Sequence, residues 1–315
     1  MLVQRQSTEL SNDVLKRIAP SIFAVAPWHE RTDQYKFVPT INVIDAMRDY
    51  GYKPVWVNQS NSRIEGKREF TKHMIRFRAA EDMASIQVKA ALPEVVLINS
   101  HDGTSSYKMM LGIFRMVCGN GMIVADKMMD SFSVRHIGDR DLCQNVIDVS
   151  GRVIADAPRA LESVNRMEQV LLSQPDQIDF SRRAIAANES TIEIEPERLL
   201  RIRRSADRPA DNGTRTLWQT LNTVQENLIR GGILGRGSNG YYRRTRAIKS
   251  IDKDVNLNRK LWNIADEMAV LRGEMPKARR TPEIIIDVKP QTQFERAKAL
   301  MVKYGNDWMN HIKEM

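Results

Sequence analysis

A chain of 315 residues with 42% hydrophobic side chains is long enough for about two domains, at roughly 100–200 residues each, and can bury a sizeable core. No apolar run approaches the ~20 residues of a membrane span, the first residues lack a secretory pattern, and two cysteines exclude a disulfide framework. We therefore expect a cytoplasmic protein that does not contact a membrane, and a net charge of +9 with a pI near 9.6 favours a polyanion as its partner.

The first third of the chain is predicted to be rich in strands. A short helix is expected at Ser11–Pro20, and a second helix begins with Thr40 as its N-cap and stops at Gly51. Apolar runs bounded by turn residues then predict about five strands, in an antiparallel or mixed sheet with flanking helices. The predicted strands are Pro54–Asn58, Lys67–Ala79, Glu94–Ser100, Met109–Val117, Met122–Ala125 and Ser131–Ile137.

After residue 140 the apolar residues follow the period of a helix. Their spacings of three and four from Leu142 to Leu171 predict a long amphipathic helix that Pro158 kinks or splits. Residues 176–193 are expected to be less regular, and helices are predicted at Thr216–Arg230 and Val255–Leu271. The fold class is therefore α+β. We expect a strand-rich domain at 1–139, a helical region at 140–275 packed on it, and a C-terminal strand and amphipathic helix at 276–315.

Nearly all of the net charge lies in one segment. Residues 197–250 carry twelve basic and four acidic side chains, a net +8, and eleven of the twelve basic residues are arginine. Arginine has a planar fork that matches phosphate oxygens, and tyrosine stacks on bases. The Gly-rich stretch around Tyr241-Tyr242 is therefore predicted to be a flexible loop that contacts single-stranded nucleic acid, with a solvated loop between two helices as the alternative. The expected contacts are Arg203, Arg204, Arg236, Tyr241, Tyr242, Arg243, Arg244, Arg246 and Lys249.

Two neighbouring strands are expected to add further arginines. Apolar and cationic residues alternate in Arg76-Phe77-Arg78 and in Phe114-Arg115. If the apolar face of the sheet packs on the helices, Arg76 and Arg78 lie on the opposite face, where they would hold a nucleic-acid backbone.

Motifs for catalysis are weaker than the basic segment. Gly235, Gly237 and Gly240 match G-x-G-x-x-G, but they follow a helix rather than a strand, so we interpret the match as accidental. Residues 99–102 are interpreted as polar side chains that satisfy one another and a turn, and Cys118 as a core residue, rather than as a hydrolase site. We assign no catalytic residue, metal or cofactor.

Five blocks of the sequence carry distinctive motifs: Asn99–Tyr107, Gly112–Gly121, Leu217–Gly232, Thr245–Asp252 and Asn258–Trp262. Together these blocks resemble a family of phage and plasmid proteins known as domain of unknown function 932. The resemblance implies a mobile-element protein in a bacterial cytoplasm and brings no catalytic residues with it. The layout of strands followed by helices is similar to that of single-strand annealing proteins of phage recombination.

The leading hypothesis is a phage or plasmid protein that binds, and anneals or protects, single-stranded DNA during replication or recombination, without catalysis. We expect a homo-oligomer, because annealing proteins commonly assemble into rings. One alternative is a Mg²⁺-dependent nuclease that uses Asp287 and Lys289, an acid and a lysine two apart at the end of an expected strand. Another alternative is a host-interaction protein whose basic segment meets an acidic protein.

Overall fold

The computed structural model describes residues 8–28, 37–84, 91–115, 121–123, 132–134 and 142–273. These residues form two compact units. The sheet unit comprises the described residues up to Gly112 together with 132–134 and 142–158, and the helical unit comprises the described residues 113–123 and 159–273. The domain limits expected from the sequence stay a prediction. The expected strand and helix of 276–315, with Asp287 and Lys289, lie outside the described residues, as do Cys118 and the turn at 119–120.

The main sheet confirms a strand-rich first third. Its strands run in the order β1-β2-β3-β4-β5, with β6 paired to β4, and the pairs β1/β2, β2/β3 and β4/β6 are antiparallel. The strands are β1 (Tyr52–Gln59), β2 (His73–Ala79), β3 (Ala91–Asn99), β4 (Tyr107–Arg115), β5 (Gly121–Ile123) and β6 (Phe132–Val134).

The start of β2 corrects one prediction. The strand expected from Lys67 begins only at His73, and Lys67–Phe70 forms the 3₁₀ turn η2. Gly66 enters this turn with φ 72°, a conformation that glycine adopts without steric cost, and Phe70 packs on Trp28 at 5.3 Å between ring centroids. The positive φ and the aromatic contact turn the chain before the sheet begins.

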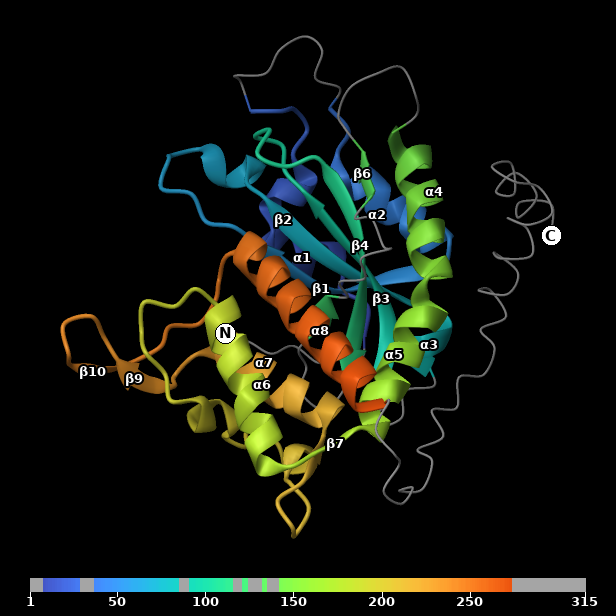
Figure 1. The fold of residues 1–315 in the computed structure, drawn as a ribbon. Helices are drawn as coiled ribbons and strands as arrows, with labels where there is room; N and C mark the ends of the chain where they lie inside the picture. Colours follow the sequence, from blue (N-terminus) through green and yellow to red (C-terminus); the bar gives the residue numbers. More distant parts are fainter. Residues whose placement is uncertain are drawn as a thin grey trace. The chain divides into compact units, whose positions relative to one another are not determined.

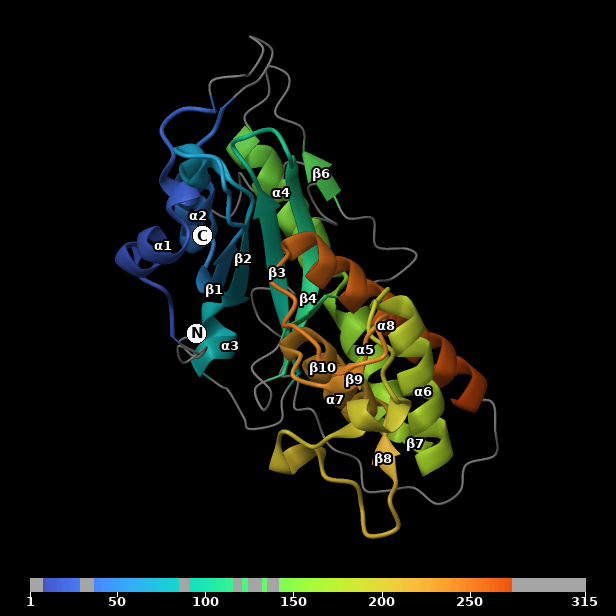
Figure 2. The same ribbon diagram turned by 90° about the vertical axis from the view of Figure 1, so that its left-hand side faces the viewer.

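Short helices accompany the sheet. Ser11 caps α1 by accepting a hydrogen bond from the Val14 amide, so the first predicted helix is confirmed. Helix α2 contacts β1, and α4 contacts β3 (Figures 1 and 2). The helical elements of this unit are α1 (Asn12–Ile18), η1 (Pro20–Phe23), α2 (Thr40–Asp49), α3 (Ala80–Ala84) and α4 (Leu142–Ala155).

The helical unit is built around α7. This helix contacts α6 and α8, and its side chains from Leu217 to Leu228 are buried except for a half-buried Gln219. Trp218 meets Trp262 of α8 edge to face, at 6.3 Å between ring centroids. The elements are α5 (Ala157–Gln169), β7 (Leu171–Leu172), α6 (Gln174–Ala187), η3 (Pro196–Leu200), η4 (Ser205–Asp207), β8 (Arg215–Thr216), α7 (Leu217–Arg230), β9 (Leu234–Arg236), β10 (Tyr242–Arg244) and α8 (Ile251–Gly273).

The helical half confirms one boundary and corrects another. The long predicted helix is split as expected, because α4 ends at Ala155 and Pro158 stands in the first turn of α5. The prediction of an irregular stretch at 176–193 is wrong over most of its length, where α6 runs from Gln174 to Ala187. The sequence contained a signal for the start of α6, because Ser173 and Asp176 form a reciprocal capping box.

The α+β class is therefore established, with an antiparallel sheet and flanking helices followed by a helical half. Within the part of the chain that the structure describes, none of the helices combines the length and the apolar character needed to cross a membrane.

Candidate nucleic-acid interface

The Gly-rich stretch after α7 is an ordered β-hairpin rather than the flexible loop expected. Strands β9 and β10 pair antiparallel with Tyr242 opposite Arg236, and the hairpin projects from helices α6 and α7 (Figure 1). The turn is closed by hydrogen bonds from the Gly237 amide to the Tyr241 carbonyl and from the Gly240 amide to the Gly237 carbonyl, both 2.9 Å. We call residues 234–249, which comprise this hairpin and the short segment after it, the cationic hairpin.

Glycine allows the hairpin to be this tight. A Cβ on Gly235 would lie 2.4 Å from the carbonyl oxygen of Glu193, whose backbone exchanges two 2.8 Å hydrogen bonds with Arg236. Gly231, with φ 64°, lies so close to the backbone of Arg246 that a Cβ would be 2.6 Å from it. Glycine at positions 231 and 235 allows neighbouring backbone segments to approach closely. This packing role agrees with the interpretation that the match to the dinucleotide-binding motif is accidental.

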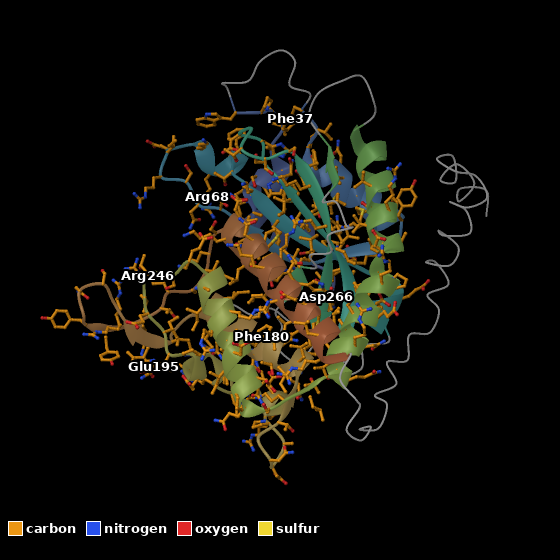
Figure 3. The ribbon with its side chains drawn as sticks, in the orientation of Figure 1. Phe37, Arg68, Phe180, Glu195, Arg246 and Asp266 are labelled. Carbon is orange, nitrogen blue, oxygen red and sulfur yellow. The ribbon has the colours of Figure 1, made fainter. Side chains whose placement is uncertain are left out.

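The cationic hairpin exposes seven of the predicted contact residues. The side chain of Tyr241 is 76% exposed and that of Tyr242 is 63% exposed. Arg246 lies on the side of the helical unit where the hairpin projects, whereas Phe180 lies among the helices (Figure 3). Across the described ranges, none of the five hairpin cations forms an ion pair with a carboxylate; these are Arg236, Arg243, Arg244, Arg246 and Lys249.

Arg203 and Arg204 differ from the hairpin cations because both are half-buried against α7. Arg203 donates from Nε to Asn227 Oδ1 at 2.6 Å and from Nη2 to the Gly231 carbonyl at 2.5 Å. Arg204 pairs with the buried carboxylate of Glu226 at 3.0 Å. Burial, reinforced by neighbouring arginines, lowers the pKa of Arg203. The structure thus brings these two residues to the root of the hairpin, with their donors already engaged.

The expectation that Arg76 and Arg78 lie on a binding face is wrong. Both are buried in β2, and both pair with Glu94 of β3, at 3.3 Å and 2.6 Å respectively. The guanidinium of Arg76 also lies 5.4 Å from the ring centroid of Trp56. Arg115 is buried too and pairs with Asp207 at 2.6 Å. These strands are covered on both faces, so alternation in the sequence did not place their cations in solvent.

The turn at residues 99–102 is part of a buried hydrogen-bonded network. Asp102 accepts from the amide and the hydroxyl of Thr104, as the turn interpretation expects. Partial burial opposes ionisation of Asp102, but the hydrogen bonds from Thr104 and Ser100 outweigh it and lower its pKa. His101 and Asn99 do not close the turn, because both contact the hydroxyl of Thr40.

Thr40 was predicted to cap α2, and this prediction is wrong. Pro39 occupies the cap position, and Thr40 is the first helical residue with its hydroxyl turned into the core. The Thr40 hydroxyl lies 3.0 Å from Nε2 of both His73 and His101.

The donors and acceptors of this network can be assigned. Gln59 uses its amide nitrogen to donate to the Thr71 hydroxyl, so its Oε1 accepts from the Ser21 hydroxyl. The Ser21 oxygen therefore accepts from Nδ1 of His73, at 2.8 Å. Burial lowers the pKa of His73 to about 4, so this ring is neutral at pH 7 with its proton on Nδ1. Its Nε2 therefore accepts from the Thr40 hydroxyl, and the Thr40 oxygen accepts from Nε2 of His101.

Comparison with known proteins gives a family match without a solved structure. Residues 27–262 match the model of the family described as Domain of unknown function (DUF932). Two relatives from Escherichia coli (strain K12) are the UPF0380 protein YafZ, 36% identical, and the UPF0380 protein YfjQ, 35% identical. Each alignment spans 266 residues, which is 84% of this chain and 93% of the relative. No solved structure matches the chain.

Proposed function

The chain belongs to the family Domain of unknown function (DUF932), and we propose that this member binds single-stranded nucleic acid through its cationic hairpin. The proposal includes a non-catalytic role in annealing or protecting strands during replication or recombination of a phage or plasmid, in the bacterial cytoplasm and as a homo-oligomer.

One observation supports the proposal most directly: the cationic hairpin combines exposed positive charge with exposed aromatic rings. Its five cations carry no carboxylate partner within the described residues, and the rings of Tyr241 and Tyr242 are mostly in solvent. An arginine that is exposed and not ion-paired can give guanidinium donors to phosphate oxygens without first breaking an ion pair. Arg236 and Arg244 each use one donor on a backbone carbonyl, those of Gly240 and Gly232, and keep their other donors for a ligand.

The chemistry of the ligand follows from these two residue types. Guanidinium groups bind the phosphate backbone irrespective of sequence, whereas tyrosine rings stack on bases that are unpaired and accessible. A duplex keeps its bases stacked inside, so the tyrosines favour single strands. We therefore expect little sequence preference and a strong dependence on salt.

Fluorescence anisotropy of a labelled oligothymidylate, titrated with the protein at several salt concentrations, tests the proposal. Each neutralised phosphate contributes about −0.7 to the slope of log K against log salt for single strands, so use of all five cations gives a slope between roughly −3 and −4. Absence of binding at ~50 mM salt, where the electrostatic contribution is strong, would contradict the proposal.

Charge reversal at Arg243 and Arg244 tests whether the cationic hairpin is the binding site. We expect Arg243→Glu with Arg244→Glu to weaken binding on the order of a hundredfold, about 2.7 kcal/mol. The matched control is Arg17→Glu with Arg182→Glu, which changes the net charge equally at exposed positions of α1 and α6. Equal losses in the two double variants would show that binding follows net charge rather than the cationic hairpin.

The same samples separate the alternatives. Incubation of labelled DNA with Mg²⁺, against EDTA and an Asp287→Asn variant, reveals a nuclease that uses Asp287 and Lys289. A pull-down that survives nuclease treatment would instead indicate an acidic protein as the partner of the basic segment.

A further inference from the structure

We propose that Arg203 is a positioning residue that fixes the cationic hairpin on α7, and that it does not itself contact phosphate. This inference rests on the proposed function of the hairpin. It distinguishes the exposed arginines of the hairpin, which are proposed to meet the ligand, from the half-buried Arg203.

The hairpin leaves α7 through two glycines. Gly231 and Gly232 follow the helix with φ 64° and 77°, in a region of backbone conformation that leaves glycine wide freedom. The amide of Gly232 donates to the Thr245 carbonyl at 2.8 Å, and the Thr245 amide donates to the Ile233 carbonyl at the same distance. These bonds close the root of the hairpin. Two backbone contacts also join the hairpin to its surroundings: the Ile248 amide donates to the Ile229 carbonyl of α7 at 2.8 Å, and Glu193 exchanges two hydrogen bonds with Arg236.

Arg203 adds side-chain hydrogen bonds at the junction between α7 and the hairpin. Its Nη2 donates to the carbonyl of Gly231, and its Nε donates to Oδ1 of Asn227 on the last turn of α7. The next carbonyl of the root, that of Gly232, accepts from Nη1 of Arg244 at 2.8 Å. Consecutive peptide groups at the hairpin root are thus held by two guanidiniums, one from the segment after η3 and one from the hairpin itself.

Asn227 extends these hydrogen bonds to a third element. It is fully buried, and its Nδ2 donates to the carbonyls of Leu199 and Arg201, each at 2.8 Å. Its Oδ1 is the acceptor for Arg203. The buried amide therefore joins η3, α7 and the guanidinium that restrains the hairpin, and it orients Arg203 toward Gly231 rather than toward solvent.

Binding through a flexible hairpin is weaker than binding through a fixed one, because only the competent fraction of the population binds. If loss of Arg203 leaves the hairpin correctly placed about a tenth of the time, the apparent affinity falls about tenfold. The number of phosphates neutralised stays the same, so the salt slope does not change. This combination distinguishes a positioning residue from a phosphate contact.

The test compares Arg203→Lys with Arg243→Lys in the full chain, using labelled oligothymidylate. Both variants keep the charge, but lysine cannot donate to Asn227 and Gly231 from the positions of Nε and Nη2. We expect Arg203→Lys to weaken binding about tenfold with an unchanged salt slope, and Arg243→Lys to bind nearly as the wild type. Near wild-type affinity for Arg203→Lys would overturn the inference.

A second measurement is independent of the ligand. Hydrogen exchange of the amides at Gly232 and Thr245 should accelerate in Arg203→Ala, while the core of α7 around Leu221 keeps its protection. Unchanged exchange at the root, together with a salt slope about 0.7 shallower, would assign Arg203 to the phosphate contacts. If the wild type does not bind oligothymidylate, the proposed function fails on its own, and the exchange data still decide whether Arg203 holds the hairpin.

Discussion

The protein places arginine pairs in two opposite environments. Arg76 and Arg78 of β2 are buried and share the carboxylate of Glu94, whereas Arg243 and Arg244 of β10 are exposed and carry no ion pair among the described residues. Both pairs lie on short antiparallel strands. The difference lies in what covers the strand, since β2 runs inside a sheet and β10 forms the outer strand of a projecting hairpin.

The comparison shows how burial decides what an arginine does. A guanidinium taken out of water must be paired inside the protein, because an uncompensated buried charge is strongly unfavourable. A guanidinium that stays in water keeps its capacity to bind an anion from solution. We therefore expect substitutions around Arg76 to change stability, and substitutions around Arg243 to change binding.

Removal of the shared carboxylate should have the largest effect. Glu94→Gln keeps the shape of the side chain but removes the negative charge that the two buried guanidiniums share. Breaking a buried pair in this way costs about 3–5 kcal/mol, so the free energy of unfolding measured in urea should fall by that order. The matched control is Glu195→Gln, which removes the exposed partner of Arg198 and should change stability by less than about 0.5 kcal/mol. Similar effects for the two variants would remove the distinction between buried and exposed pairs.

Acidification should also lower the stability of the folded protein, through the buried side chain of His73. The pKa of His73 is lowered to about 4 in the folded chain from an ordinary value near 6.5, so the unfolded chain binds the extra proton between these values. The stability held by neutral His73 is therefore complete above about pH 6.5 and is lost as the pH falls toward 4, by up to roughly 1.4 kcal/mol per unit.

The network gives the structural reason for this pH dependence. A proton on Nε2 of His73 would leave the Thr40 hydroxyl facing donors from His73, His101 and Asn99, which exceeds its two lone pairs. Urea unfolding at pH 7 and pH 5 should show a smaller loss of stability on acidification in His73→Gln than in the wild type. Equal losses would show that His73 does not contribute.

Aromatic substitution in the hairpin should give the smallest of these effects. Tyr241→Ala should weaken binding of a single strand by roughly 1–2 kcal/mol, because one stacked base is lost. The salt slope should not change, since no charge is removed, and Tyr241→Phe should retain most of the affinity because it keeps the ring. A loss for the phenylalanine variant equal to that for alanine would assign the effect to the hydroxyl rather than to stacking.

Prediction from sequence succeeded where a local signal was sufficient. Ser11 indicated the start of α1, and Pro158 indicated the break between α4 and α5, because both residues act on their immediate backbone. The capping box of Ser173 and Asp176 was an equally local signal for α6 that the prediction of an irregular stretch overlooked. The clustering of positive charge in residues 197–250 was found by counting basic and acidic residues alone.

The errors came from residues whose role depends on distant partners. Thr40 is a good cap by composition, but His73 and His101, more than thirty residues away in the chain, draw its hydroxyl into the core. Arg203 and Arg204 belong to the same basic segment as Arg243, yet α7 supplies acceptors to both of them. The spacing of residues along the chain does not show which distant side chains will be in contact in the folded protein.

The sequence by itself determined the α+β class, the position of most helices, and the location of the positive charge in residues 197–250. These properties depend on local periodicity, capping residues and composition, all of which act over a few residues. Only the tertiary structure decided which arginines are buried against Glu94, which one donates to Asn227 and Gly231, and which remain in solvent. The physical reason is that burial and pairing are set by elements that meet in space, so the environment of a charge is a property of the fold and not of its neighbours in the chain.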